Sequence, residues 1–300
     1  MIKRIFGRKL SLTPETHSVF DMDDSTFIDF AYHFILRRAP DRAGKKTYLN
    51  DLAKGNINRD FLLKILGQSE EFRSIQIDSM GLSIHQSRIQ WVKSLPKADY
   101  IIDLGGASKG SKEGALVAMG YPYKFKELTI VDLPLDERHS LYAEGYDAID
   151  SFVSSSGRIR YIYTSMTNLS QFADSSMDFI NCGQTIEHIM ESESDRLFKE
   201  CLRILKPGTY FCLDTPNAQA TRVQQDEFID PDHKIEYRHE ELNTKLENAG
   251  FQIMDSKGIN YLPESIRKCE FDENEVTKNY GIFDDIENCY ILAYRCQKPI

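Results

Sequence analysis

Short apolar runs alternate with stretches of helical spacing from Tyr100 to the end of the chain, and no other feature constrains the fold as strongly. Such runs, bounded by turn residues, are typical of buried strands, and strands that alternate with helices form a parallel sheet with helices on both faces. The sequence therefore predicts an α/β fold with a Rossmann-like, doubly wound sheet over residues 98–300. The runs that we interpret as strands are Tyr100–Leu104, Leu128–Asp132, Ile159–Tyr163, Met177–Asn181, Tyr210–Asp214, Phe251–Met254 and Tyr290–Tyr294.

Charge and cysteine usage narrow the function classes. The net charge of −9 repels phosphate backbones and counts against a nucleic-acid partner. No apolar run approaches the ~20 residues of a membrane-spanning helix. The six cysteines include no CxxC pair, and Cys182, Cys201 and Cys212 fall within apolar segments, as reduced core residues do. We therefore expect a cytoplasmic protein.

Three amphipathic helices are predicted ahead of the sheet, in a module over residues 21–76. Asp41 is placed to cap the second helix, which stops at Gly55, and Asn58 or Asp60 opens the third. Residues 1–20 form a basic tail, for which an unstructured segment and a peripheral membrane contact are the two interpretations.

This module resembles a small domain of unassigned function, whose members are often fused to enzymes of surface-polysaccharide assembly. The resemblance implies a third helix that ends in a Ser-x-Glu-Phe motif. The residues that carry it are Leu36-Arg-Arg-Ala-Pro-Asp41, Gly44, Tyr48, Leu52, Gly55 and Ser69-Glu-Glu-Phe72.

Two further segments flank the predicted sheet strands. Residues 77–97 are predicted as a connector helix that ends at Pro96. Residues 259–288 interrupt the last two strands, and we interpret them as an insertion that covers the substrate, with a solvated loop as the alternative.

The turn after the first predicted strand has the features of a ligand-binding loop. Gly105, Gly106 and Ala107 follow Asp103, and small residues there let the backbone approach a ligand. Asp132 ends the next strand, at the same edge of the sheet, where a carboxylate can bind both hydroxyls of a ribose. The pattern predicts a site for a nucleoside-containing ligand.

Four ordered motifs resemble those of the class I S-adenosylmethionine-dependent methyltransferases. They are the Asp103–Ala107 loop, Asp132, the strand and turn Ser176–His188, and Arg203–Gly208 followed by Pro216-Asn217. The resemblance implies a sheet whose last strand is antiparallel, S-adenosylmethionine (SAM) as cofactor, and methyl transfer as the reaction. The cofactor contacts that it implies are Asp103, Gly105, Gly106, Ala107, Asp132, Ser165, Met166, Cys182 and Gln184.

Three positions depart from the family pattern. Ala107 and Lys109 replace usual glycines, and Ser165 stands where many members carry an Asp near the adenine. The sequence leaves open whether these departures weaken cofactor binding.

The chemistry is expected at Glu187, His188 and His233. Methyl transfer to a hydroxyl needs alignment and removal of a proton, and imidazole titrates near neutral pH. Some members of the resembled family bind a divalent metal with Glu-x-x-Glu-His and a later His; here Gln184 replaces one carboxylate, which lowers the expected metal affinity. A metal site formed by these three residues with Gln184, a metal-free acid–base cluster, and a purely structural role all stay open.

The most specific hypothesis is a SAM-dependent O-methyltransferase that acts on a sugar hydroxyl in surface-polysaccharide biosynthesis. The expected partner is a small-molecule or glycan acceptor, and the sugar rests on the helical module alone. The alternatives are an RNA 2′-O-methyltransferase-like enzyme, suggested by Glu187-His188 and His233, and a non-catalytic scaffold with a degenerate domain. The oligomeric state is left open.

Overall fold

A computed structural model describes residues 22–140, 149–224, 227–262 and 279–300. It separates into two compact units, with the division after Gln76. The basic tail predicted over residues 1–20 and most of the insertion predicted over 259–288 lie outside the described residues. Each unit is described by itself.

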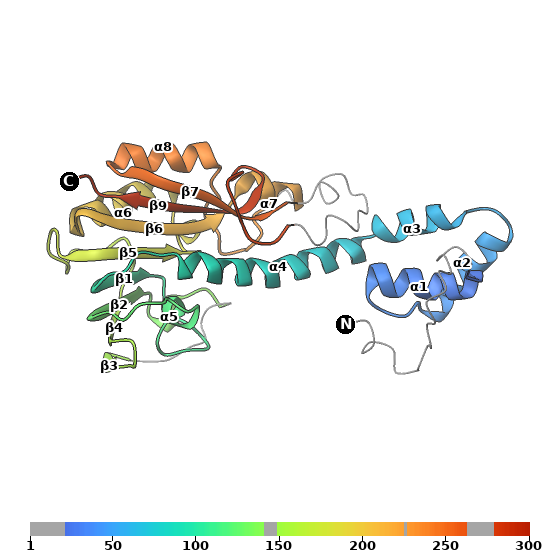
Figure 1. Ribbon diagram of the computed structural model, residues 1–300, viewed down its shortest axis with the longest axis horizontal. Helices are drawn as coiled ribbons and strands as arrows, with labels where there is room; N and C mark the ends of the chain where they lie inside the picture. Colours follow the sequence, from blue (N-terminus) through green and yellow to red (C-terminus); the bar gives the residue numbers. More distant parts are fainter. Residues whose placement is uncertain (1–21, 141–148, 225–226, 263–278) are drawn as a thin grey trace. The chain divides into compact units, whose positions relative to one another are not determined.

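The first unit contains three short helices around a small apolar core (Figure 1). Asp41 caps the second helix by accepting a hydrogen bond from the Gly44 N–H, and Asn58 caps the third. Both caps agree with the sequence prediction. The three helices are α1 (Asp24–Leu36), α2 (Arg42–Ala53) and α3 (Arg59–Gly67).

The Arg-x-Pro-Asp-x-x-Gly pattern of this unit has a structural explanation. Arg38 forms an ion pair with Glu71, and its guanidinium carbon lies 5.2 Å from the ring centroid of Tyr32. A Cβ at Gly44 would lie 2.9 Å from Asp41 Oδ2 and 3.0 Å from the Tyr32 hydroxyl. The motif therefore joins the ends of the helices, and these contacts account for its residues.

The helix boundaries differ from the prediction at Ser69–Phe72. Helix α3 ends at Gly67, and Ser69 begins the next helix by accepting a hydrogen bond from the Phe72 N–H at 3.1 Å. That helix, α4, runs without a break from Glu70 to Lys93. The predicted connector helix over 77–97 is therefore the later part of one long helix, and the Ser-x-Glu-Phe motif opens this helix rather than closing α3.

The second unit contains a nine-stranded mixed sheet in the order β3-β4-β2-β1-β5-β6-β9-β7-β8 (Figure 1). Its five central strands are parallel, and β9 lies antiparallel between β6 and β7, as the resemblance implied for the last strand. The principal strands are β1 (Tyr100–Leu104), β2 (Glu127–Asp132), β4 (Arg158–Tyr163), β5 (Met177–Gly183), β6 (Leu205–Pro216), β7 (Gln252–Tyr261) and β9 (Cys289–Gln297).

Several parts of the second unit were not predicted. The edge strands β3 (Ser151–Val153) and β8 (Ile282–Phe283) pair antiparallel to β4 and β7. Strand β7 extends to Tyr261, so the start of the predicted insertion is strand. In the described residues the only helices in the crossings from β1 to β2 and from β2 to β4 are α5 (Ala115–Ala118) and a 3₁₀ turn (Leu135–Glu137). The predicted alternation of strands and helices therefore placed more helix in these two crossings than the described residues contain.

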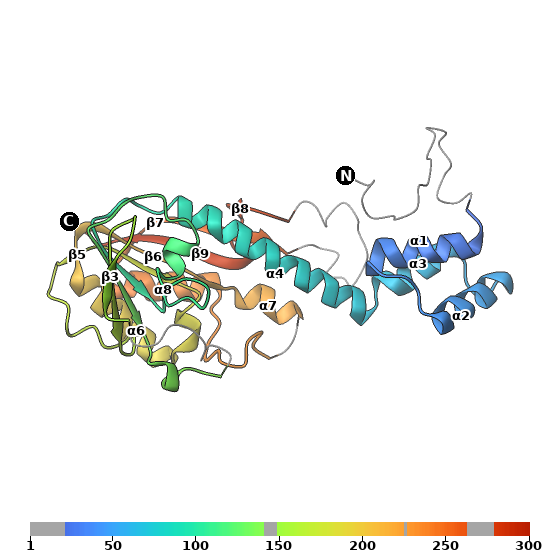
Figure 2. The same cartoon turned by 90° about the horizontal axis from the view of Figure 1, so that it is seen from below.

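Two apolar cores lie on opposite faces of this sheet (Figure 2). Helices α6 (Glu191–Ile204) and α8 (His239–Ala249) cover one face, and α4, α5 and α7 (Ala218–Gln224) cover the other. Neighbours such as Ile101 and Ile102 divide between the two cores, because successive strand side chains point to opposite faces. Cys182, Cys201 and Cys212 are buried, as predicted. No helix among the described residues is long and apolar enough to cross a membrane.

Candidate active site

A cavity of about 340 Å³ opens at the carboxyl ends of β1, β2, β4 and β5. Doubly wound sheets bind ligands at this edge, because loops from several strands converge there. The cavity brings together six of the nine predicted cofactor residues and one of the predicted catalytic residues. These residues are Gly105, Ala107, Asp132, Ser165, Met166, Gln184 and His188.

The glycines of the loop after β1 are required by close packing. Gly105 has a φ of 66°, and a Cβ there would lie 2.2 Å from Thr185 Cγ2. A Cβ at Gly106 would lie 2.2 Å from Asp103 Oδ2. Since L side chains rarely adopt this φ and neither clash can be relieved cheaply, the loop keeps its shape only with glycine at these positions.

Asp132 is anchored at the cavity wall by the neighbouring backbone. Its Oδ2 accepts a hydrogen bond from the Ala107 N–H at 3.0 Å, and its Oδ1 accepts one from the Leu133 N–H at 2.8 Å. Arg138 Nε lies 3.3 Å from the same Oδ1. Burial raises the pKa of Asp132, and Arg138 partly opposes this rise. Ala107 acts here through its backbone, so the departure from glycine leaves this contact intact.

Asp103 and Cys182 do not line the cavity, contrary to the prediction. Asp103 is buried beneath the loop, where it accepts hydrogen bonds from the Asn181 side chain at 2.7 Å and from the Leu116 N–H at 3.3 Å. Burial raises its pKa to about 7. The Cys182 side chain belongs to the apolar core, and burial raises the pKa of its thiol. Gly106 is likewise outside the lining, because it faces Asp103.

Ser165 and Met166, which were expected near the adenine of the cofactor, both line the cavity. The Ser165 hydroxyl lies 2.9 Å from Thr167 Oγ1 and accepts a hydrogen bond from the Thr167 N–H at 3.2 Å. It therefore shapes the turn after β4, while Met166 contributes an apolar surface to the cavity.

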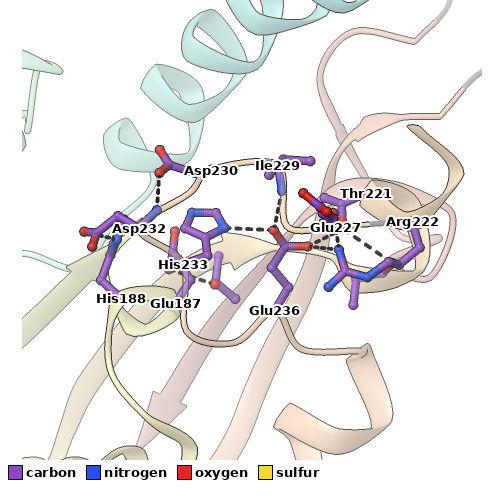
Figure 3. A network of polar contacts seen from close by, with 12 residues as sticks. Glu187, His188, Thr221, Arg222, Glu227, Ile229, Asp230, Asp232, His233 and Glu236 are labelled. Carbon is purple, nitrogen blue, oxygen red and sulfur yellow. Dashed lines mark hydrogen bonds and ion pairs between the residues drawn. The ribbon is translucent and has the colours of Figure 1, made fainter. Parts of the chain in front are cut away.

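Glu187, His188 and His233 lie close together (Figure 3), and His188 is the one of the three that lines the cavity. Their ligand-type atoms all lie within 4.8 Å of one another. The two imidazole rings meet edge to face, with centroids 5.0 Å apart. Glu187 is buried and accepts a hydrogen bond from the Thr215 hydroxyl at 2.9 Å. His188 faces the cavity, whereas Glu187 and His233 lie behind it.

Comparison with known families decides what kind of domain this cavity belongs to. Residues 123–213 match the family model described as a methyltransferase domain. The chain contains a methyltransferase domain. Residues 11–75 match the model described as a domain of unknown function (DUF4214).

Individual relatives agree with this assignment. A protein of Mycolicibacterium smegmatis named as a probable S-adenosylmethionine-dependent methyltransferase is 35% identical over 86 residues, which span 29% of this chain and 33% of that protein. The Ubiquinone biosynthesis O-methyltransferase of Paracidovorax citrulli is 22% identical, and the match covers 71% of this chain and 84% of that protein. The chain thus spans about a third of the length of the first relative.

The fold is shared with a solved structure from Haloferax volcanii, a chain in the complex between the Trm112 methyltransferase activator and a methyltransferase. That chain is 16% identical, with a TM-score of 0.51, and the match covers 76% of this chain and 95% of that one. At this identity the match shows the Rossmann-like fold alone.

Sequence reasoning missed the carboxylates that hold the two histidines of the methyltransferase domain. His188 Nδ1 lies 3.0 Å from Asp232 Oδ2, and His233 Nδ1 lies 2.8 Å from Glu236 Oε1 (Figure 3). Glu236 is itself fixed by Thr221 and Arg222. The available signal was local: Asp232 precedes His233, and Glu236 follows it by three residues.

The protonation of this cluster follows from its burial. Burial raises the pKa of Glu187 to about 7. Burial also lowers the pKa of His188, and the neighbouring His233 lowers it further. For His233 burial acts in the same direction, but the hydrogen bond to Glu236 and the charge of Glu187 outweigh it and leave the pKa raised. The Glu187 carboxyl therefore titrates near neutral pH, beside a His233 imidazole whose charged form is favoured.

The same three residues fit the ligands of a divalent metal. A metal-bound histidine typically donates its other ring nitrogen to a carboxylate, and His188 and His233 both meet that condition. Gln184 fits less well, because its amide nitrogen donates to Asp214 Oδ1 at 2.9 Å and it brings no charge.

Proposed function

We propose that this protein is a SAM-dependent O-methyltransferase in which Glu187, His188 and His233 remove the proton of an acceptor hydroxyl. The observation that carries the proposal is that Asp132 and His188 line one cavity. A cofactor whose ribose bonds to Asp132 and an acceptor beside His188 would thus share a single enclosed space, as in-line displacement requires.

The chain's own residues supply the acid–base chemistry of the proposed reaction. Because the Asp232 carboxylate accepts from Nδ1 of His188, a neutral His188 carries its lone pair on Nε2. Its lowered pKa favours this neutral form, so the ring can take a proton from a hydroxyl in the cavity. The Asp232 carboxylate stabilises the resulting positive charge, and so does Glu187 once it is ionised, whereas the neighbouring His233 opposes it. A divalent metal bound by Glu187, His188 and His233 would instead polarise the acceptor oxygen and lower its pKa.

The finer proposal concerns the acceptor. We propose a sugar hydroxyl of a surface polysaccharide, supported by the resemblance of the helical module to domains that accompany such enzymes. The O-methyltransferase name of the Paracidovorax relative supports a hydroxyl acceptor in general. The acidity of the chain counts against RNA as the acceptor.

The test is transfer of a labelled methyl group from SAM to a panel of hydroxyl acceptors that contains nucleotide sugars, oligosaccharides, catechols and RNA. We expect label on a carbohydrate, with the rate lowered by about a hundredfold in His188→Ala. Methyl label on RNA alone would contradict the carbohydrate acceptor and favour the RNA alternative. SAM binding without transfer to any acceptor would favour the scaffold alternative.

A further inference from the structure

Arg88 on α4 forms a buried ion pair with Asp214, a residue that contacts the cavity-lining Gln184. Its Nε donates to Asp214 Oδ1 at 2.6 Å, and the two side chains are 16% and 2% exposed. Gly183 makes room for this approach, because a Cβ there would lie 3.0 Å from Arg88 Nη2. Burying a charge pair costs free energy, so this pair is of interest for the residues that it orients.

Asp214 in turn fixes Gln184, which lines the cavity. The Gln184 side-chain nitrogen donates to Asp214 Oδ1 at 2.9 Å, and the Gln184 N–H donates to the Asp214 carbonyl at 2.7 Å. Gln184 has a φ of 55°, a conformation that non-glycine residues rarely adopt. Two hydrogen bonds to one residue therefore hold both the backbone and the side chain of Gln184.

We propose that Arg88 is a positioning residue for the cofactor site, acting through Asp214 on Gln184. A glutamine amide can present either a donor or an acceptor, and only its hydrogen-bond partner decides which. Arg88 Nε and the Gln184 amide nitrogen both donate to Asp214 Oδ1, so the Arg88–Asp214 pair holds the acceptor that orients the Gln184 amide. The side chain then offers Oε1 to the cavity ligand, as an acceptor for the ammonium group of SAM. This inference rests on the proposed function, because it takes SAM as the ligand.

The experiment measures SAM binding by calorimetry and KM and kcat in the methyl-transfer assay. Removing Arg88 alone would leave Asp214 as an uncompensated buried charge, so the pair is replaced together as Arg88→Met with Asp214→Asn. Gln184→Met is made in the unaltered protein and in the pair variant. Lys245→Met is the matched control, because Lys245 also forms ion pairs and is 17% exposed but lies outside the cavity lining.

We expect the pair variant to raise the Kd and KM for SAM by about tenfold with kcat unchanged. In the Gln184→Met background the pair replacement should add less than about twofold, since its effect passes through Gln184. Two results would overturn the positioning role. One is that the rises in Kd caused by the pair replacement and by Gln184→Met multiply when the two are combined. The other is that the pair replacement raises the Kd no more than Lys245→Met does. Absence of SAM binding by the unaltered protein would overturn the proposed function itself, and with it the ligand assumed here.

Discussion

His188 and His233 meet edge to face with ring centroids 5.0 Å apart, and each ring contacts a different carboxylate through Nδ1. Asp232 and Glu236 thereby fix the orientation of both rings. This arrangement separates the roles of the two histidines: His188 lines the cavity, and His233 is buried with Glu187 behind it.

Methyl transfer should depend on pH through Glu187. Burial raises the pKa of Glu187 to about 7, so the carboxylate that can accept a proton forms as the pH rises through that value. We expect kcat of the metal-free enzyme to increase from about pH 6 to about pH 8. Glu187→Gln should abolish this rise of kcat with pH. If the rise persists unchanged in the variant, it belongs to the titration of another group.

The same raised pKa predicts a change of stability with pH. The ionised form of Glu187 is disfavoured in the folded state, so the stability contributed by the protonated carboxyl is complete below about pH 4.5 and is lost as the pH rises through about 7. The free energy of unfolding of the wild type, measured in urea, should fall relative to that of Glu187→Gln as the pH rises between those limits. If the free energies of unfolding of the two proteins change with pH in the same way, the Glu187 carboxyl is not held protonated by burial.

Asp232→Asn should reduce kcat by roughly tenfold to a hundredfold, because the amide no longer fixes the Nδ1 proton of His188. The Kd for SAM should stay within about twofold, since the Asp232 carboxylate acts on His188. Asp284→Asn is the control, because Asp284 forms an ion pair with Lys257 and its side chain is 93% exposed. Equal losses in both variants would show that the effect of Asp232→Asn is not local.

Metal removal distinguishes the acid–base cluster from a metal site. We expect activity to persist after exhaustive chelation, because the cluster contains one carboxylate and Gln184 is bonded to Asp214. Activity that is lost with the chelator and restored by Mg²⁺, Mn²⁺ or Zn²⁺ would instead assign Glu187, His188 and His233 as ligands. In that case His233→Ala should abolish the restoration.

Gly105→Ala should destabilise the domain by ~1–3 kcal/mol, because it forces an L side chain into a left-handed conformation and against Thr185. Gly110→Ala is the matched control in the same loop, since nothing lies within 4 Å of its added Cβ. Urea unfolding of both variants checks the difference. A loss of similar size at Gly110 would mean that the loop is sensitive to any added side chain.

The sheet could be predicted from its apolar runs because buried parallel strands leave a strong local signal, as in Tyr100–Leu104 and Leu128–Asp132. The edge strand Ser151–Val153 left no such signal, because only one of its three residues is even half-buried. The boundary at Ser69 was missed because its hydroxyl caps the following helix, and a serine can equally end the preceding one.

The position of Asp132 in the cavity lining could be predicted, because it depends only on where one strand ends. The candidate site was not predictable where function depends on partners distant in sequence. Arg88 and Asp214 are separated by 126 residues and meet only because α4 packs against the sheet. Cys182 was expected both in the core and among the cofactor contacts, and its side chain lies in the apolar core.

The most direct test of the account is calorimetric titration of the full chain with SAM, in parallel with Asp132→Ala. The account predicts one site per chain in the wild type and a Kd raised by at least about a hundredfold in the variant, because Asp132 is the carboxylate placed to hold the ribose. Equal affinity in the two proteins would contradict the assignment of this cavity to the cofactor.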